Sequence, residues 1–202
     1  MVAILFARAD SVYKTLPDVD VWDAERDARR WPGGCPVVAH PPCRAWGRLR
    51  HMANPRPDEM DLARLSVSLV REFGGVLEHP SGSKLWADQG LPEIGLIDEY
   101  GGWTLPISQN WWGHRAEKKT WLYIVGCEPN NIPTIPLALG AAPMVVANGS
   151  KNHLQRGEIG WRPQIPHAER EHTPINLAKW LVSLASKCKV RPGKIKLKGA
   201  EK

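Results

Sequence analysis

Cys43 is the residue whose type and neighbours best suit nucleophilic chemistry. Pro41 and Pro42 precede it and restrict the backbone, so we expect the thiol on a rigid, preset loop. Arg44 follows directly, and its positive charge, together with any nearby histidine, is expected to lower the pKa of the thiol toward the reactive thiolate. The same sequence is also compatible with Cys43 as a small buried hydrophobic residue.

Glu78 is the second candidate, because it stands at the end of a predicted strand. A carboxyl group there can protonate or hydrogen-bond a bound base or substrate, although a salt bridge or a cap would explain it equally well. Several cations then lie between Trp112 and Lys119, directly before another predicted strand. They suit an anionic substrate such as a nucleotide phosphate, with an ordinary solvated edge as the alternative.

A zinc site is the competing interpretation of the cysteine and histidines. His40 and Cys43 are separated by two residues, and His79 and His114 follow later, which are ligand types that zinc accepts. No second closely spaced ligand pair accompanies them, and the prolines restrict the loop. The sequence therefore favours a site without metal.

The elements that would position these residues form an α/β pattern. Short apolar runs alternate with longer segments of helical period. Strands are expected at 2–6, 19–22, 36–40, 74–79 and 119–126. Helices are expected over 57–73 and in the C-terminal segment, where Thr173 is the expected N-cap, Pro174 fits the first turn and Ile175 lies on the apolar face. The segments 80–118 and 127–172 are rich in Gly, Pro and Trp, and irregular loops are expected there.

Three of the predicted strands are followed directly by unusual polar loops, at 7–11, 41–47 and 80–83. Ligands of open α/β sheets bind outside the carboxyl ends of the strands. If the sheet is parallel, the three loops share one edge and converge on one pocket. This convergence is the main argument for an active site.

Composition and charge limit the possible classes of protein. The 202 residues, of which 43% are hydrophobic and 24% charged, are typical of one globular domain. No apolar run is long enough to span a membrane, the opening residues are not typical of a signal peptide, and the four cysteines form no C-x-x-C pair. We therefore expect a cytoplasmic protein with free thiols.

The excess positive charge is confined to the C-terminus. Residues 187–202 carry seven basic residues and one acidic residue, whereas basic and acidic residues balance in 1–186. The sequence thus predicts a compact domain over 1–186 and a basic, disordered tail over 187–202. The tail could add salt-sensitive affinity for a phosphate backbone, or be a solvated terminus without a partner.

Ten tryptophans are many for this length, and half of them lie in or beside the polar loops. These five are Trp46, Trp86, Trp103, Trp111 and Trp112. Exposed aromatic rings near cations would suit the stacking of bases. The rings could equally form the core of loops that have few other hydrophobic residues.

Three ordered motifs resemble those of DNA cytosine-5 methyltransferases. The strand that ends in Pro41-Pro42-Cys43 is similar to their nucleophile loop, and Val76–Pro80 is similar to their Glu-Asn-Val or Glu-Asn-Pro loop. Residues 113–126 resemble their arginine-bearing motif and its strand. Short phage and prophage proteins of this kind carry AHPPC, ENP and FGH...K.T.LWL signatures, which correspond here to 39–43, 78–80 and 112–122. The resemblance covers about residues 1–126, with weaker similarity in the terminal helix.

The resemblance implies a fold and a setting. The fold would be a single Rossmann-like domain of the S-adenosylmethionine-methyltransferase type, with a mostly parallel sheet and helices on both faces. A target-recognition domain would be reduced or absent, since only about 50 residues separate Gly126 from the terminal helix. DNA or a pyrimidine nucleotide would be the substrate, and a partner subunit could supply target recognition. The protein would act in a bacterial cell that carries the phage or prophage.

The resemblance also implies a mechanism. The target cytosine would be turned out of the helix, the Cys43 thiolate would add to C6, and Glu78 would hold or protonate N3. Arg115 or Lys118 would contact the base carbonyl or a phosphate. C5 would then take a methyl group from S-adenosylmethionine. The implied substrate-binding residues are Pro42, Arg44, His79, His114 and Lys118, with Cys43, Glu78 and Arg115 as the catalytic residues. The implied cofactor-binding residues are Phe6, Ala7, Asp10, Ser11, Asp23 and Glu25.

One departure from the family keeps other functions open. The family's first loop is glycine-rich, whereas Phe6–Ser11 contains no glycine. The same pocket could therefore modify C5 of a cytosine or uracil with a different one-carbon donor. A third possibility is a catalytically inactive relative that binds DNA or a phage or host protein.

Overall fold

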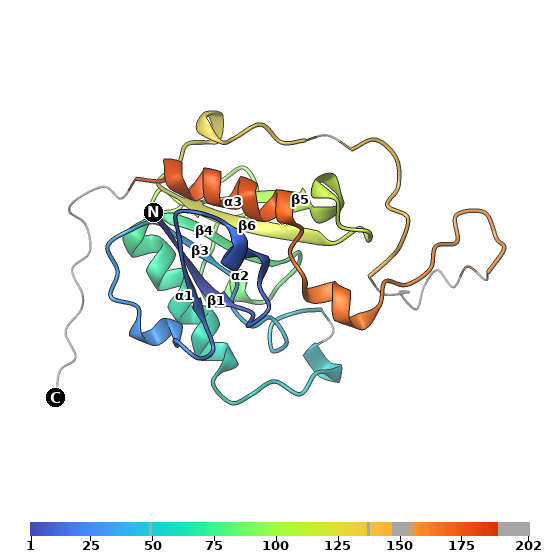
Figure 1. Cartoon of the computed structure of the whole chain (residues 1–202), viewed down its shortest axis with the longest axis horizontal. Coiled ribbons are helices and arrows are strands. Elements are labelled where there is room, and N and C mark those ends of the chain that lie inside the picture. The colour runs from blue at the N-terminus through green and yellow to red at the C-terminus, as the bar shows by residue number, and fades with distance from the viewer. Residues whose placement is uncertain (49, 137, 147–153, 155, 190–202) are drawn as a thin grey trace.

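Six strands form one mixed sheet in the order β2-β1-β3-β4-β6-β5 (Figure 1). The computed structural model describes residues 1–48, 50–136, 138–146, 154 and 156–189. The strands are β1 (Val2–Ala7), β2 (Val19–Asp23), β3 (Val37–Ala39), β4 (Gly75–Pro80), β5 (Trp103–Ser108) and β6 (Lys119–Val125). The five strands predicted from apolar runs are all present, with ends that differ by at most one residue.

The strand directions bring the predicted loops together. β2, β1, β3 and β4 run parallel to one another, so β1, β3 and β4 end at the same edge of the sheet. β6 runs antiparallel to β4, and β5 antiparallel to β6. The sheet is therefore mixed, with a four-stranded parallel part that carries the three polar loops.

β5 corrects the expectation of an irregular loop throughout 80–118. Gly101 and Gly102 precede this strand and Pro106 lies within it, which is why its sequence does not look like a strand. Proline lacks the amide hydrogen of a ladder and is confined mainly to edge strands. β5 is an edge strand of this sheet.

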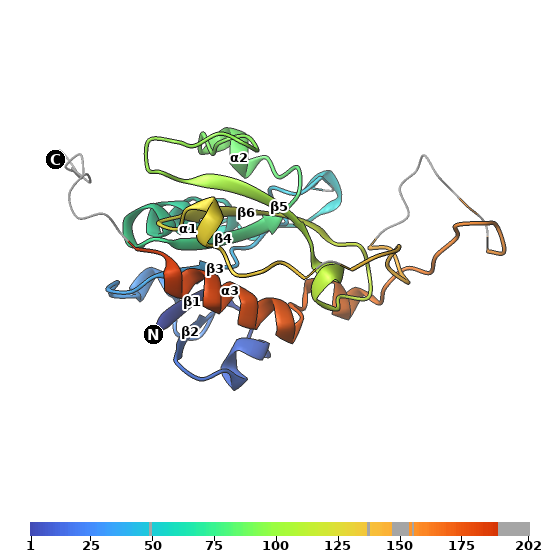
Figure 2. The same cartoon turned by 90° about the horizontal axis from the view of Figure 1, so that it is seen from above.

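Helices cover both faces of the sheet. α1 (Glu59–Phe73) and the short α2 (Leu85–Asp88) lie on one face, and α3 (Ile175–Lys187) lies on the other (Figure 2). Side chains alternate between the faces of a strand, so β1 contributes Ala3 and Leu5 to the α1 side and Val2 and Ile4 to the α3 side. Two apolar cores result, one on each side of the sheet.

The start of α3 differs from the prediction. Pro174 is the N-cap and the helix begins at Ile175, with no hydrogen bond from a capping side chain, so Thr173 is not the cap. Ile175 is 38% exposed and lies outside the apolar face, which consists of residues from Leu177 onward. Pro174 is itself extended, with a ψ of 142°, so the cap lies one residue later than the sequence pattern suggests.

Six short 3-10 helices complete the described chain. They are η1 (Val12–Thr15), η2 (Ala28–Arg30), η3 (Arg50–Met52), η4 (Gln109–Trp112), η5 (Pro129–Asn131) and η6 (His167–Glu171). Apart from η5, η6 and isolated bridges, the described residues of 127–172 are irregular, as expected.

The boundary of the predicted tail lies later than residue 187. Lys187 ends α3, Cys188 is only 3% exposed, and the amide of Lys189 donates to the carbonyl of Gly126 at 2.8 Å. Residues 187–189 thus pack on the domain, and the remaining tail, 190–202, lies outside the described residues. All four cysteines carry free thiols, as predicted.

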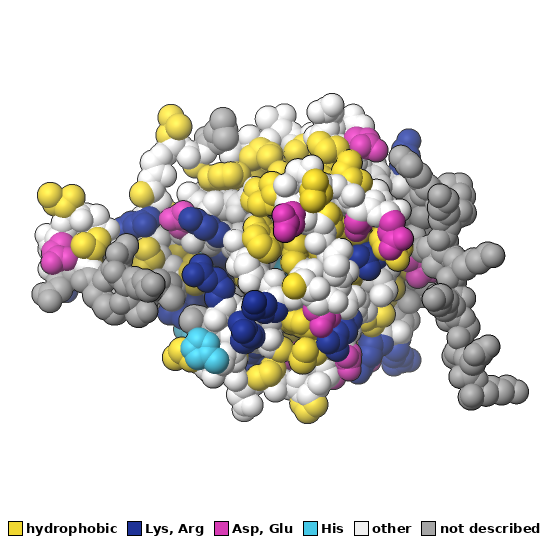
Figure 3. Space-filling model, turned by 180° about the vertical axis from the view of Figure 1, so that it is seen from behind, with side chains coloured by type: hydrophobic (Ala, Val, Ile, Leu, Met, Phe, Trp, Pro, Cys, Tyr) yellow, Lys and Arg dark blue, Asp and Glu magenta, His cyan; other side chains and the backbone are white. Residues whose placement is uncertain are grey.

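The surface carries both signs of charge. On the face opposite to that of Figure 1, lysine and arginine side chains are interspersed with aspartate and glutamate (Figure 3). Many of them pair, as Arg64 does with Asp61 and Asp88. In the described part of the chain, no helix has both the length and the apolar character that a bilayer crossing requires.

Candidate functional site

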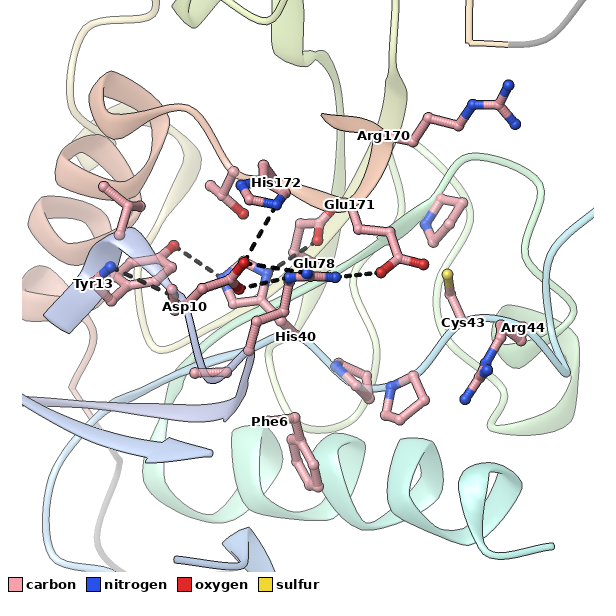
Figure 4. Close-up of a pocket in the computed structure, with 18 of the residues that line it drawn as sticks. Phe6, Asp10, Tyr13, His40, Cys43, Arg44, Glu78, Arg170, Glu171 and His172 are labelled. Atoms are coloured by element: carbon pink, nitrogen blue, oxygen red, sulfur yellow. Dashed lines mark hydrogen bonds and ion pairs between the residues drawn. The ribbon is translucent and has the colours of Figure 1, made fainter. Parts of the chain in front are cut away.

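A cavity of about 400 Å³ lies at the edge of the sheet where β1, β3 and β4 end (Figure 4). The loops after β1 and β3 line it, together with Glu78 and Pro80 of β4 and the segment Arg170–Thr173, which precedes α3. Its volume falls in the range of sites for small molecules, roughly 300–1,000 Å³. The expected convergence is therefore present for the loops at 7–11 and 41–47, whereas only Pro80 of the predicted loop at 80–83 reaches the cavity.

Cys43 faces this cavity from the loop after β3. Its carbonyl accepts hydrogen bonds from the amides of Trp46 and Gly47, at 3.0 and 2.9 Å, which close a tight turn behind the thiol. This turn adds to the restriction by the two prolines, so the sulfur is held on a rigid loop.

The predicted activation of the thiol by Arg44 is wrong for the free protein. Burial and the negative charges of Glu78 and Glu171 raise the pKa of Cys43 to about 11, and Lys118 only partly opposes them. The guanidinium of Arg44 points away from the sulfur and pairs with the buried carboxylate of Glu59. Cys43 is therefore in its protonated thiol form in the free protein.

Glu78 lines the same cavity from the end of β4. Its Oε2 lies 3.0 Å from Nδ1 of His40, and its Oε1 accepts a hydrogen bond from Nε2 of Gln109, also at 3.0 Å. Burial opposes ionisation, but the hydrogen bond from His40 and the positive charge of Lys118 outweigh it and lower the pKa of Glu78 to about 2. Glu78 is therefore an anion with both oxygens held.

His40 connects Glu78 to Tyr13. Its Nε2 lies 2.9 Å from the hydroxyl of Tyr13, a residue of η1 that is 1% exposed. Burial and the charge of Glu78 raise the pKa of Tyr13 well above its ordinary value, so the hydroxyl keeps its proton. Neither Tyr13 nor Gln109 was found by sequence analysis, because each arrives from a distant turn and neither lies in a recognisable motif.

Two cations of the cavity lining, Lys118 and Arg170, make no ion pair with a carboxylate within the described residues; Arg170 instead donates to Oε1 of Gln164 at 3.4 Å. Arg8 pairs with Asp10 and Glu171, at 2.9 and 2.5 Å, and Arg44 pairs with Glu59. An anionic group of a ligand would therefore meet Lys118 without displacing an existing pair.

Three residues proposed from the family motif lie outside the cavity lining. Arg115 pairs with Glu169, with Nε 3.0 Å from Oε2, and is turned toward the surface. His79 is fully buried against Trp86, which lowers its pKa to about 4. His114 is 7% exposed and its Nδ1 lies 2.8 Å from the carbonyl of Ala116. Pro42, Arg44 and Lys118 of the same set do line the cavity.

The residues expected to bind a cofactor divide into two groups. Phe6, Ala7, Asp10 and Ser11 line the cavity, whereas Asp23 and Glu25 do not. The Asp23 carboxylate is engaged elsewhere, by the Lys14 ammonium at 2.7 Å and by the amides of Glu25 and Arg26. Glu25 is exposed.

The backbone at the end of β1 adopts the conformation that glycine favours. Phe6 has a φ of 60°, and the pairing of β1 with β2 shifts register between Leu5 and Ala7. A side chain other than glycine is uncommon in this region and costs on the order of 1 kcal/mol or more. Phe6 therefore holds, at an energetic cost, a backbone conformation that glycine adopts without strain.

η6 covers part of the cavity through ion pairs. Glu169 pairs with Arg115, Glu171 with Arg8, and His172 lies 3.6 Å from Asp10. No residue of η6 is buried. Sequence analysis did not include this segment in the site, because no pattern in its residues indicates which distant charges they meet.

The tryptophans of the polar loops mainly serve packing. Trp46, Trp86, Trp103 and Trp112 are each less than 9% exposed, and only Trp111 of the five is partly exposed. The interpretation as a core for the loops is therefore the correct one for four of the five. No group of three or more His, Cys, Asp or Glu side chains suited to a metal ion occurs among the described residues.

Comparisons with known proteins add no family. No family model matches the sequence. No curated protein matches it significantly either.

Proposed function

We propose that this chain is a phage-type DNA (cytosine-5)-methyltransferase-like enzyme, in which the Cys43 thiolate adds to C6 of a pyrimidine and C5 receives a methyl group from S-adenosylmethionine. One observation carries the proposal. Cys43 follows β3, Glu78 lies near the end of the neighbouring parallel strand β4, and both line one cavity. Addition to a pyrimidine ring requires a nucleophile and a carboxylate in one cavity, because attack at C6 must be matched by stabilisation of charge at N3.

The state of Glu78 supports cytosine as the base. Its carboxylate is ionised and both oxygens accept N–H donors, so a further polar group of a ligand must also be a donor. The 4-amino group of cytosine is a donor, whereas the 4-oxo group of uracil is an acceptor and would be repelled. N3 of cytosine is an acceptor, so it can approach the Glu78 carboxylate only with a proton between them. As Cys43 adds to C6, the proton lost by its thiol is carried by Glu78 to N3.

The residues after β1 would hold the methyl donor. S-adenosylmethionine supplies an electrophilic methyl group when bound. The small side chains of Ala7 and Ser11 line the cavity and leave room there, and the positive φ of Phe6 turns the backbone alongside it. A Rossmann-like methyltransferase fold is supported by the four parallel strands and by the helices on both faces of the sheet.

The engagement of Asp23 favours a second candidate function. Asp23, which would hold the cofactor ribose, is bound to Lys14 and to two backbone amides. Modification at C5 of a pyrimidine base or nucleotide with another one-carbon donor would use Cys43 and Glu78 in the same way but would not need Asp23. The two functions differ in whether S-adenosylmethionine is consumed.

The proposal includes partners and a setting. The substrate is DNA or a pyrimidine nucleotide. A partner subunit supplies target recognition. The segment between β6 and α3 is short and its described residues are mostly irregular, so it does not provide a target-recognition domain. The proposed location is the cytoplasm of a bacterium that carries the phage or prophage.

Trapping of a covalent adduct tests the proposal. Wild-type protein is incubated with 5-fluorocytosine in duplex DNA, in single-stranded DNA and as the nucleotide, with and without S-adenosylmethionine. We expect an adduct that survives denaturation and that Cys43→Ser abolishes. Cys35→Ser is the matched control, because Cys35 is a partly exposed thiol outside the cavity. An adduct that needs no S-adenosylmethionine would favour the second candidate, and no adduct with any substrate would favour an inactive binding relative.

A further inference from the structure

We propose that Tyr13 and His40 form a proton relay that removes the proton from C5 of the pyrimidine after C5 has been modified. The inference rests on the proposed function, since it assigns residues to a step that this function requires. Modification of C5 leaves a proton there, and the ring regains its C5–C6 double bond only when a base takes that proton. Neither Cys43 nor Glu78 performs this step in the proposed function.

The geometry is a chain of carboxylate, imidazole and hydroxyl. Oε2 of Glu78 lies 3.0 Å from Nδ1 of His40, and Nε2 of His40 lies 2.9 Å from the hydroxyl oxygen of Tyr13. The three residues come from the end of β4, the end of β3 and η1, and all three line the cavity. A carboxylate that orients an imidazole, which in turn accepts the proton of a hydroxyl, is a general arrangement for proton transfer.

The charge of Glu78 fixes the tautomer of His40. An ionised carboxylate only accepts hydrogen bonds, so Nδ1 of His40 carries a hydrogen and donates it to Glu78. In a neutral imidazole, Nε2 then has a free lone pair and accepts the hydrogen of the Tyr13 hydroxyl. His40 is therefore positioned to take a proton from Tyr13, and Glu78 would stabilise the imidazolium that forms.

The position of Tyr13 suits the C5 side of the ring. In Figure 4, Tyr13 and Cys43 lie on opposite sides of Glu78 and His40. If the methyl donor occupies the end of β1 as proposed, C5 must face that loop, because C5 receives the methyl group. η1, which carries Tyr13, follows directly on that loop.

The step balances in protons and electrons. Tyr13 takes the proton from C5 while its own hydroxyl proton passes to Nε2 of His40, which becomes an imidazolium. The electron pair of the C5–H bond forms the C5–C6 double bond, and the pair of the C6–S bond returns to the Cys43 sulfur. The proton that N3 gained during addition returns to the Cys43 thiolate, and the imidazolium releases its extra proton, by way of Tyr13, to water.

The relay predicts that Tyr13→Phe separates two steps that wild-type protein performs together. With a cytosine substrate tritiated at C5 and S-adenosylmethionine, adduct formation is followed by denaturing electrophoresis and C5 proton loss by tritium release. We expect the adduct to form at the wild-type rate in Tyr13→Phe. Its breakdown and tritium release slow on the order of 100-fold, the usual lower bound for loss of an acid–base group, so the adduct accumulates. His40→Gln should slow breakdown as well, because the variant cannot take the proton from Tyr13.

Tyr123→Phe is the matched control. Tyr123 is fully buried and its hydroxyl donates to Asp98 at 2.6 Å, but it lies outside the cavity, so its variant should behave like the wild type. Breakdown at the wild-type rate in Tyr13→Phe would overturn the relay and leave the proposed function intact. Equal slowing of both steps would also overturn it, because that is the result expected of a structural role. Wild-type protein that forms no adduct would refute the proposed function, and the relay with it.

Discussion

Arg115 and Lys118 are three residues apart, but only Lys118 faces the cavity. Arg115 is turned toward Glu169 and pairs with it at the surface. The family motif suggested either residue as the contact to an anion. The structure favours Lys118, because it lines the cavity, whereas Arg115 is paired with Glu169.

We expect Lys118→Gln to weaken binding of a pyrimidine nucleotide and Arg115→Gln to leave it unchanged. Loss of a hydrogen bond to a charged group corresponds to a decrease in affinity on the order of 10-fold or more. The measurement is calorimetric titration with cytidine monophosphate. Arg115→Gln should change the free energy of unfolding by less than about 1 kcal/mol, because its pair is exposed. Equal effects of the two variants on binding would contradict this assignment.

Alkylation of Cys43 should depend steeply on pH. The pKa of its thiol is raised to about 11, so the rate with iodoacetamide should rise about 10-fold per pH unit between pH 7 and 10. Mass spectrometry of the Cys43 peptide measures this rate, with circular dichroism as a check that the fold persists. Glu171→Gln should shift the curve to lower pH, because Glu171 is one of the negative charges that disfavour the thiolate. A midpoint below pH 9 in the wild type would contradict the prediction.

Stability should fall in acid in two stages. The folded-state pKa of His79 is lowered from 6.5 to about 4, so its contribution is present above pH 6.5 and is lost as the pH falls toward 4. The pKa of Glu78 is lowered from 4.5 to about 2, so its contribution is present above pH 4.5 and is lost as the pH falls toward 2. Thermal unfolding between pH 2 and 7 measures both.

Variants separate the two stages. Glu78→Gln should flatten the dependence of the melting temperature below pH 4.5 and leave the stage above it in place. Asp61→Asn is the control, because the Asp61 side chain is 79% exposed. If Glu78→Gln and the control gave the same acid profile, Glu78 would not be the stabilising anion that the structure describes.

S-adenosylmethionine should bind with micromolar affinity by calorimetry. Ala7→Leu should weaken binding at least about 10-fold, because a larger side chain fills the cavity at the end of β1. Ala141→Leu makes the same change at an exposed position away from this cavity and should have no effect. No heat of binding in the wild type would discard the methyl donor and favour a different one-carbon donor.

Truncation after Lys189 tests the basic tail. The residues removed include five basic residues and one acidic residue, and their loss should weaken binding to DNA and flatten its salt dependence. Binding is measured by fluorescence anisotropy at several salt concentrations. The cut follows Lys189 because Cys188 and Lys189 pack on the domain. Unchanged affinity and salt dependence would mean that the tail takes no part in binding.

The parts of the fold that follow from local sequence could be predicted. Buried strands such as β1 and β6 have continuous apolar runs, and α1 has an apolar stripe with Gly74 after its end. β5 could not be predicted, because an edge strand that contains Pro106 is specified by its pairing with β6 rather than by its own residues. The same applies to the turn at Phe6, where the surrounding sheet overrides a local preference.

The candidate site could be predicted only where it lies on strand ends. Cys43 and Glu78 follow apolar runs, so the rule for the carboxyl ends of parallel strands brought them together. Glu171 and Gln109 enter the site through tertiary contacts with residues far away in the sequence. The pKa of Cys43 could not be predicted from Arg44 either, because the buried Glu59 binds that guanidinium.

The contacts of η6 affect how reactants reach the cavity beside Cys43. This segment buries none of its own side chains and holds on through exposed ion pairs, each of which contributes about 0–1 kcal/mol. Unfolding of a whole domain costs about 5–15 kcal/mol, so η6 can separate from the cavity while the sheet stays folded. Salt weakens exposed ion pairs, so we expect higher ionic strength to loosen η6 more than it loosens the sheet.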